Sequence, residues 1–384
     1  MKLLVCPALA ALALSSAPAA ARVLEVGAGR AYAMPSDAAA VARDGDTVAI
    51  AAGSYFDCAS WHASRLTIAG PAHGDDGPLA VITDRACAGK AAFVIAGDGV
   101  TVRGISFERI RVPDGNGAGI RAEGRDLTVQ DCRFVNDQVG ILAGGEGGAL
   151  RIIATSFVAN GASFVANGAS FVATGASLDA RPTHAVLAGA LDLLRIERSS
   201  FRHARGGDHV VSAARRTELV GNAFADEGGH MTGALVWVEG GALTLDGNTI
   251  ELAAATRATP AADRPGAVLF TGDATALTVR GNTLIEPAGI EPTGIEPAGI
   301  EPAGIEPAGI EPAGDVPLLR NWSGLAATAA DNTVPPNAVA VSASGATYHR
   351  LRARLAGLRE QARAMALSVR HQLAELARGW RLLP

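Results

Sequence analysis

Leu243-Thr-Leu245-Asp-Gly-Asn248-Thr-Ile250 and Leu277-Thr-Val279-Arg-Gly-Asn282-Thr-Leu284 are two copies of one sequence pattern. In each copy, two apolar residues flank a polar one, a tight turn follows, and a large apolar residue comes last. This alternation is typical of a half-buried strand that ends at a corner. Five earlier copies begin at Val100, Leu127, Leu150, Leu194 and Thr217, and end at Phe107, Phe134, Phe157, Phe201 and Phe224.

The spacing of the copies indicates a repeating structural unit. Successive copies begin 27, 23, 44, 23, 26 and 34 residues apart. The interval of 44 contains three near-identical heptapeptides at residues 156–176, and without those 21 residues it becomes 23. A unit of about 23 residues that varies only in its loops is one coil of a β-solenoid.

A second short strand precedes most copies and completes the coil. Examples are Gly119-Ile-Arg-Ala122 and Gly140-Ile-Leu-Ala143. Stacked coils pair each strand in parallel with its counterpart, which satisfies the backbone hydrogen bonds that a lone coil leaves open. The crossover rule favours right-handed winding. The sequence therefore predicts an all-β, single-stranded, right-handed parallel β-helix.

A column of small and polar residues lies two places before the large apolar residue. It holds Asn222, Asn248 and Asn282 in three successive coils. We expect these amides to hydrogen-bond from coil to coil, at a corner that tolerates left-handed backbone. The earlier members of the column are Ile105, Cys132, Thr155 and Ser199.

These features resemble the bacterial right-handed β-helix repeat proteins, which share a fold with pectate lyases and polygalacturonases. The opening segment is similar too, with a short helix around Ala38–Val41, then Asp44-Gly-Asp-Thr-Val48 and Ala52-Gly-Ser-Tyr55. The resemblance implies that this segment caps the N-terminal end of the stack. It covers roughly residues 24–345 and concerns the fold, since one fold hosts many functions.

The ends of the chain differ in kind from its middle. Residues 1–21 have the pattern of a signal peptide, with Lys2, an apolar stretch and Ala19-Ala20-Ala21. We therefore expect a secreted or periplasmic protein, with a solenoid over 22–345 and no transmembrane span. Residues 285–314 repeat Ile-Glu-Pro-Ala-Gly, which favours an extended loop.

Three cysteines remain after the expected cleavage, so they cannot all pair within one chain. Cys58 and Cys87 lie in irregular stretches, which favours a disulfide between them. Cys132 lies in the column before the large apolar residues, where a buried thiol is expected.

A basic amphipathic helix is predicted over residues 346–384, because apolar residues recur there three and four places apart. Its other face carries eight arginines against Glu360 and Glu375. Docking on the solenoid is favoured because outward residues of the second strand type, such as Leu142 and Trp237, form an apolar stripe. Binding to an anionic membrane surface and self-association are the alternatives.

The densest group of reactive side chains lies at mid-solenoid. Asp208 and His209 are candidate catalytic residues, because histidine can act as a general base. Arginines can hold a carboxylate or sulfate, and a polar corner without further role explains the same pattern. The histidines here lack metal-ligand spacing, so no metal site is predicted and any cofactor stays unknown. The candidate substrate-binding residues are His203, Arg205, Arg215 and Arg216.

Two function classes remain, and the sequence does not decide whether the protein is an enzyme. The net charge of −5 is too mild to suggest nucleic acid as a partner. Resemblance to β-helix enzymes implies polysaccharide lyase or glycoside hydrolase activity on an acidic polysaccharide, with the substrate in a polar groove. Arg109-Ile-Arg-Val-Pro113 has only part of the lyase element, and Asp75-Asp76 lacks the motifs that accompany hydrolase aspartates. A carbohydrate-binding or structural module of the cell envelope is therefore favoured.

Overall fold

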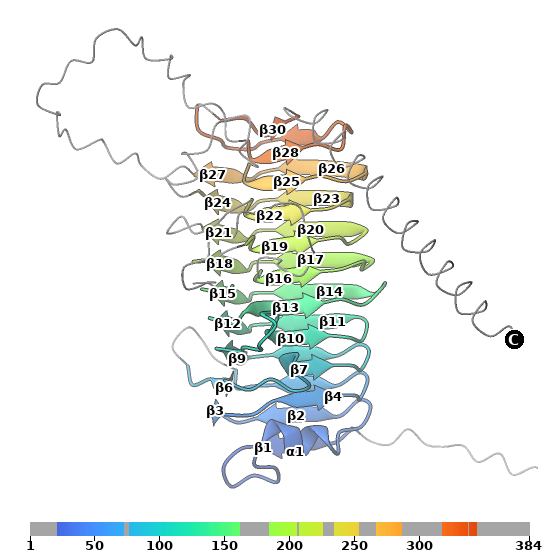
Figure 1. Ribbon diagram of the computed structural model, residues 1–384, viewed down its shortest axis with the longest axis vertical. Helices are drawn as coiled ribbons and strands as arrows, with labels where there is room; N and C mark the ends of the chain where they lie inside the picture. Colours follow the sequence, from blue (N-terminus) through green and yellow to red (C-terminus); the bar gives the residue numbers. More distant parts are fainter. Residues whose placement is uncertain are drawn as a thin grey trace, which may run out of the picture.

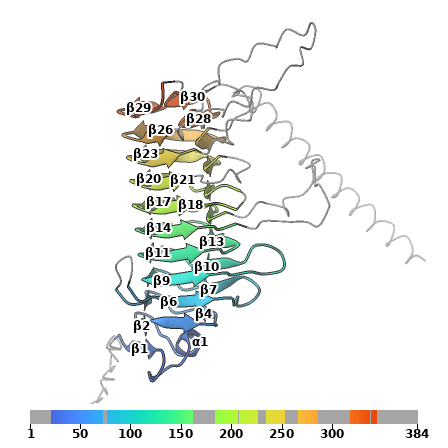
Figure 2. The same cartoon turned by 90° about the vertical axis from the view of Figure 1, so that its left-hand side faces the viewer.

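The computed structural model describes residues 21–72, 77–161, 184–205, 207–225, 234–252, 266–285, 317–336 and 338–343. These residues form a parallel β-helix of three sheets, and its strands follow one another up the long axis in chain order (Figures 1 and 2). All strand pairs within the three sheets are parallel, as the repeat pattern predicted.

Sheet A has 11 strands and contains the Leu-Thr-Val segments. Inward residues such as Val129 and Ile152 are fully buried, and they alternate with half-buried polar residues. Its strands are β1 (Val23–Val26), β2 (Thr47–Ile50), β5 (Thr67–Ala69), β8 (Thr101–Arg103), β11 (Leu127–Gln130), β14 (Ala149–Ile153), β17 (Leu193–Glu197), β20 (Arg216–Val220), β23 (Gly241–Asp246), β26 (Ala274–Arg280) and β29 (Thr328–Ala330).

Sheet B has nine strands and carries the large apolar residues that end each copy of the pattern. Its strands are β3 (Gly53–Tyr55), β6 (Ala80–Thr83), β9 (Ile105–Glu108), β12 (Arg133–Val135), β15 (Ser156–Val158), β18 (Ser200–Arg202), β21 (Ala223–Ala225), β24 (Thr249–Glu251) and β27 (Thr283–Ile285).

Sheet C has ten strands and contains the second strand type. Its strands are β4 (Ala59–Trp61), β7 (Ala91–Ile95), β10 (Ala118–Ala122), β13 (Val139–Ala143), β16 (Val186–Ala188), β19 (Val210–Ser212), β22 (Val236–Val238), β25 (Val268–Phe270), β28 (Leu319–Asn321) and β30 (Val341–Ser342).

A stack of phenylalanine rings fills the core behind sheet B. The ring centroids of Phe157 and Phe201 lie 4.7 Å apart with an interplanar angle of 2°. Such stacks need space on the opposite wall, and glycine provides it: a Cβ atom on Gly140 would lie 2.9 Å from the Phe157 ring and 2.5 Å from the Ala185 carbonyl oxygen. The stacked rings are those of Phe107, Phe134, Phe157, Phe201 and Phe224.

The expected asparagine ladder joins the coils at the corner between sheets A and B. The Asn222 Nδ2 atom donates to Asn248 Oδ1 at 3.0 Å, and Asn248 donates in the same way to Asn282 at 2.9 Å. Asn332 adds a further step, accepting from Asn282 Nδ2 at 3.0 Å. The residue before each ladder position has positive φ, as at Gly247 (64°), which explains the preference for glycine there.

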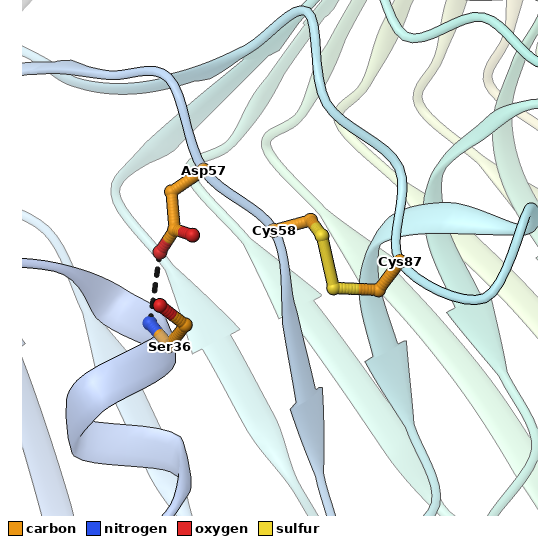
Figure 3. The surroundings of a disulfide bond; sticks show 4 residues. All are labelled: Ser36, Asp57, Cys58 and Cys87. Atoms are coloured by element: carbon orange, nitrogen blue, oxygen red, sulfur yellow. Dashed lines mark hydrogen bonds between the residues drawn. A yellow bond between two sulfur atoms is a disulfide. The ribbon is translucent and has the colours of Figure 1, made fainter.

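The disulfide between Cys58 and Cys87 links loops of two neighbouring coils near the N-terminal end (Figure 3). Beside it, helix α1 (Pro35–Ala39) donates its Ser36 N–H to the Asp57 carboxylate at 2.8 Å. This helix begins and ends earlier than the segment around Ala38–Val41 in the sequence-based expectation, and its role as a cap stays a prediction.

Two further expectations fall on the inserts and the tail. β15 pairs directly with β18, and residues 162–176 of the heptapeptide run lie outside the described residues. Most of residues 156–176 and 285–314 and all of 346–384 lie outside the described residues, so the predicted C-terminal helix stays a prediction. Cys132 is a buried free thiol, and burial raises its pKa to about 12.

Candidate functional site

The six candidate residues at mid-solenoid do not form one cluster. His203 and Arg205 are exposed at the corner between sheets B and C, before β19. Arg215 and Arg216 are exposed after β19, with Arg215 at the corner between sheets C and A and Arg216 at the start of β20. The three residues of β19 therefore separate the two pairs, and the coil directs them to different edges of the solenoid.

His209 belongs to the core. Its ring lies 5.7 Å from the Phe201 ring centroid and 6.3 Å from that of Phe224, and the residue is 1% exposed. Nε2 lies 3.3 Å from the Ala225 carbonyl oxygen. Burial lowers the pKa of His209 to about 4, so the ring is neutral at pH 7 and enclosed by side chains.

Asp208 is also buried, at 6% exposure. Its backbone N–H donates to Nδ1 of His184 at 3.1 Å, which joins two successive coils. Burial raises the pKa of the Asp208 carboxyl to about 7. A carboxyl with this pKa could exchange a proton near neutrality, but Asp208 is almost fully buried and its backbone is bonded to the ring of His184.

The outer face of sheet A carries the longest ordered set of polar groups. One outward residue from each of ten successive strands lies in register with the next, and every member is polar. We call this set the sheet A column. Seven members are threonines, and three charged residues interrupt them in the middle. The column is Thr47, Thr67, Thr101, Thr128, Arg151, Arg195, Glu218, Thr244, Thr278 and Thr328.

The charged centre of the sheet A column contains both paired and unpaired groups. The Arg195 guanidinium bonds Glu197 and lies 2.5 Å from a Glu218 carboxylate oxygen, and hydrogen bonds to these acids raise its pKa. Arg216 reaches Glu218 at 3.2 Å. Arg151, one strand from Arg195, has no ion pair within the described part of the chain. Sequence patterning identified the polar face, but not its unbroken register.

The outer face of sheet C is apolar, as the second strand type predicted. Leu142, Leu187 and Val211 lie in register, and with neighbouring residues they line a cavity of about 150 Å³ that also borders Glu239. Leu142 and Val211 are buried, whereas Trp237 on the next strand is 36% exposed. The expected apolar stripe on the outer face of sheet C therefore exists.

The partial lyase element has a structural role in this fold. Arg109 bonds both oxygens of the Asp84 carboxylate, at 3.0 and 2.8 Å. This pairing lowers the pKa of Asp84 and ties one coil to the next. Asp75 and Asp76 lie outside the described residues, and within the described ones no three His, Cys, Asp or Glu side chains gather as a metal site. No helix of the described part is long and apolar enough to cross a membrane.

Comparison with known proteins adds a fold likeness only. No protein-family model and no curated protein sequence matches the chain. Among solved structures, the chain is similar to a mutant pectin methylesterase in complex with a hexasaccharide, with 11% identity and a TM-score of 0.40. The match covers 69% of this chain and 78% of the other. A likeness this distant carries no argument about chemistry.

Proposed function

We propose that this protein is an exported module that binds a polysaccharide along the outer face of sheet A. The observation that carries the proposal is the sheet A column, an unbroken line of polar residues over ten strands. Neighbouring strands are about 4.8 Å apart, so a linear polymer lying along the stack meets a polar group at every step. Threonine hydroxyls both donate and accept, which suits sugar hydroxyls.

The charges at the centre of the column favour an acidic polymer. Arg151 has no partner in the described part of the chain, and a guanidinium binds carboxylate or sulfate with paired hydrogen bonds. A polymer that contacts many coils gains binding free energy at each of them, so each single contact can be weak. The column runs over ten strands, which fits a polymer that binds along its length better than a small molecule.

A binding role fits better than catalysis because of where the candidate catalytic groups lie. His209 is enclosed by Phe201 and Phe224, and Arg215 lies at the other end of β19. Polysaccharide lyase or hydrolase activity is the alternative. Export is part of the proposal, and the disulfide between Cys58 and Cys87 supports it because disulfides persist in oxidising compartments.

The test is binding to a panel of immobilised polysaccharides, including polygalacturonate, alginate, xylan and cellulose. The variant replaces Thr101, Thr128 and Thr244 with valine, which removes hydroxyls that make no hydrogen bond within the described chain. The matched control replaces Thr249 and Thr283 with valine on the outer face of sheet B.

We expect wild type and control to bind an acidic polymer and the sheet A variant to lose binding. Equal binding by all three proteins, or none to any polymer, contradicts the proposal. New reducing ends and the absorbance of unsaturated uronates are measured in parallel. If the wild type produces either signal, the proposal of a binding module is replaced by that of a catalyst.

We also propose that the helix predicted within 346–384 docks on sheet C. The tail follows β30, the last strand of that sheet, and the apolar face with Trp237 fits an amphipathic helix. Glu239 borders the cavity and can pair with an arginine. Hydrogen exchange in β16 and β22 should increase when residues 346–384 are removed, and unchanged exchange would contradict docking.

A further inference from the structure

Two arginines from distant parts of the chain meet at one amide oxygen. Arg111 Nη2 donates to Asn136 Oδ1 at 2.6 Å and to the Asn136 carbonyl oxygen at 3.1 Å. Arg205 Nη1 donates to the same Oδ1 atom at 2.7 Å, across 69 residues of sequence. Coil stacking at the corner between sheets B and C brings the three residues together.

Backbone geometry holds Asn136 in this place. It has a φ of 57° and follows β12, at a corner where Asp84, Arg109 and His203 also have positive φ in other coils. Asparagine and aspartate tolerate this left-handed backbone better than most residues. The Arg205 backbone is fixed as well, because its N–H donates to the Asn160 carbonyl oxygen at 2.9 Å.

The two guanidiniums at this corner differ from that of Arg109 in the group that they bond. Two residues before Arg111, in the same coil, Arg109 bonds both oxygens of the Asp84 carboxylate at 3.0 and 2.8 Å. Arg111 and Arg205 share a neutral amide oxygen and have no ion pair with a carboxylate among the described residues, and two cations that converge on one point repel each other. The carboxyl of Asp137 next in the chain is fully buried and bonds the Ile110 N–H instead. Both guanidiniums belong to exposed residues, so their remaining N–H groups are open to a ligand.

We infer that Arg111 and Arg205 form a binding site for an oxyanion, a carboxylate or sulfate group, bridged across Asn136. A guanidinium pairs with such a group through two parallel hydrogen bonds, and two guanidiniums can hold one anion between them. The site lies between sheets B and C, away from the sheet A column. It does not depend on polysaccharide binding by sheet A, so either idea can fail without the other.

The test uses the full chain after signal removal, with sodium sulfate and galacturonate as probes in calorimetric titrations at low ionic strength. Arg111→Gln and Arg205→Gln each remove one guanidinium. Arg133→Gln is the control, because Arg133 is an exposed cation on the nearby strand β12 without an ion pair in the described chain. We expect each site variant to lose about tenfold in sulfate affinity and the control to stay near wild type.

Asn136→Asp separates this site from a change in folding. The new carboxylate would lie within reach of both guanidiniums, so the variant should unfold at a higher temperature than the wild type and no longer bind sulfate. Sulfate affinity that is equal in wild type and both glutamine variants would overturn the inference, as would sulfate binding retained by Asn136→Asp. If polygalacturonate displaces sulfate at a lower concentration than galacturonate does, the ligand is a group carried on a polymer. If polygalacturonate shows no such advantage, the ligand is a free ion.

Discussion

Asn160 Oδ1 accepts the backbone N–H of Asp137 at 3.0 Å, and the two residues occupy the same position in neighbouring coils. Asp137 Oδ1 repeats the contact one coil further, accepting the Ile110 N–H at 2.9 Å. The second polar atoms of the two side chains, Asn160 Nδ2 and Asp137 Oδ2, differ in their hydrogen bonding. Asn160 Nδ2 donates to the Phe134 carbonyl oxygen at 2.9 Å, whereas Asp137 Oδ2 has no hydrogen-bond partner among the described residues.

Asp137→Asn should stabilise the protein at pH 7. Burial raises the pKa of Asp137 well above its ordinary value, so the folded protein keeps a proton that the unfolded chain releases. Stability contributed by this group is therefore present below about pH 4 and is lost as the pH rises toward the folded pKa. We expect the amide to add about 1–3 kcal/mol at pH 7 and to flatten this slope, as urea unfolding at several pH values would measure. A variant no more stable than wild type at pH 7 would contradict this reading.

His209 should make the fold sensitive to acid. Burial lowers its pKa to about 4 from the ordinary histidine value of 6.5, so the unfolded chain takes up a proton first. The stability that depends on the neutral ring is present above pH 6.5 and is lost as the pH falls toward 4. Relative to wild type, His209→Leu should gain stability over this interval in urea unfolding. If the difference in unfolding free energy between the two proteins does not change with pH, the imidazole ring is exposed to solvent and the prediction is wrong. Binding to acidic polysaccharide should be unaffected at pH 7.

The asparagine ladder should be costly to interrupt. Asn248 Oδ1 accepts the Asn222 N–H at 3.0 Å, and Asn248 Nδ2 donates to the Leu219 carbonyl oxygen at 2.8 Å. Asn248→Ala leaves both buried groups unpaired, and we expect a loss of about 3 kcal/mol in chemical unfolding. Asn248→Ser should lose less, because Ser199 accepts the Thr155 N–H with its hydroxyl at the same corner. Equal losses for both variants would show that volume matters here and not hydrogen bonding.

Gly140 should not accept even one methyl group. A Cβ atom there would overlap the Ala185 carbonyl and press on the Phe157 ring. We expect Gly140→Ala to lower the free energy of unfolding by about 2–3 kcal/mol. Gly145→Ala is the control, since its Cβ would meet nothing closer than 3.7 Å. If the two variants unfold at the same urea concentration, the ring stack has more freedom than its geometry indicates.

Repetition made most of the fold predictable. A pattern that recurs once per coil fixes which residues lie in register, so the alignment of the phenylalanines and the ladder through Asn282 were predictable from sequence. The last step, at Asn332, was missed because the strand before it, Thr328–Ala330, no longer alternates large apolar and polar residues.

The candidate site was less predictable because local clustering in sequence does not determine direction. His209 and Arg215 are close in the chain, yet one side chain lies in the core and the other belongs to an exposed corner. Arg205 was named as a binding residue, but its partner Asn136 and the second donor to that residue, Arg111, lie on other coils. Variable loops and the heptapeptide insertion separate these coils, so only the stack reveals that they meet.

The dependence of affinity on oligomer length tests binding along sheet A most directly. Oligogalacturonides of increasing length would be titrated into wild type, the three-valine variant of sheet A and Arg151→Gln. We predict an affinity that rises at least about tenfold from the dimer to oligomers spanning several coils, and that falls in both variants. A dimer that binds as tightly as the longest oligomer, or long oligomers that bind both variants as tightly as wild type, would contradict binding along the sheet A column.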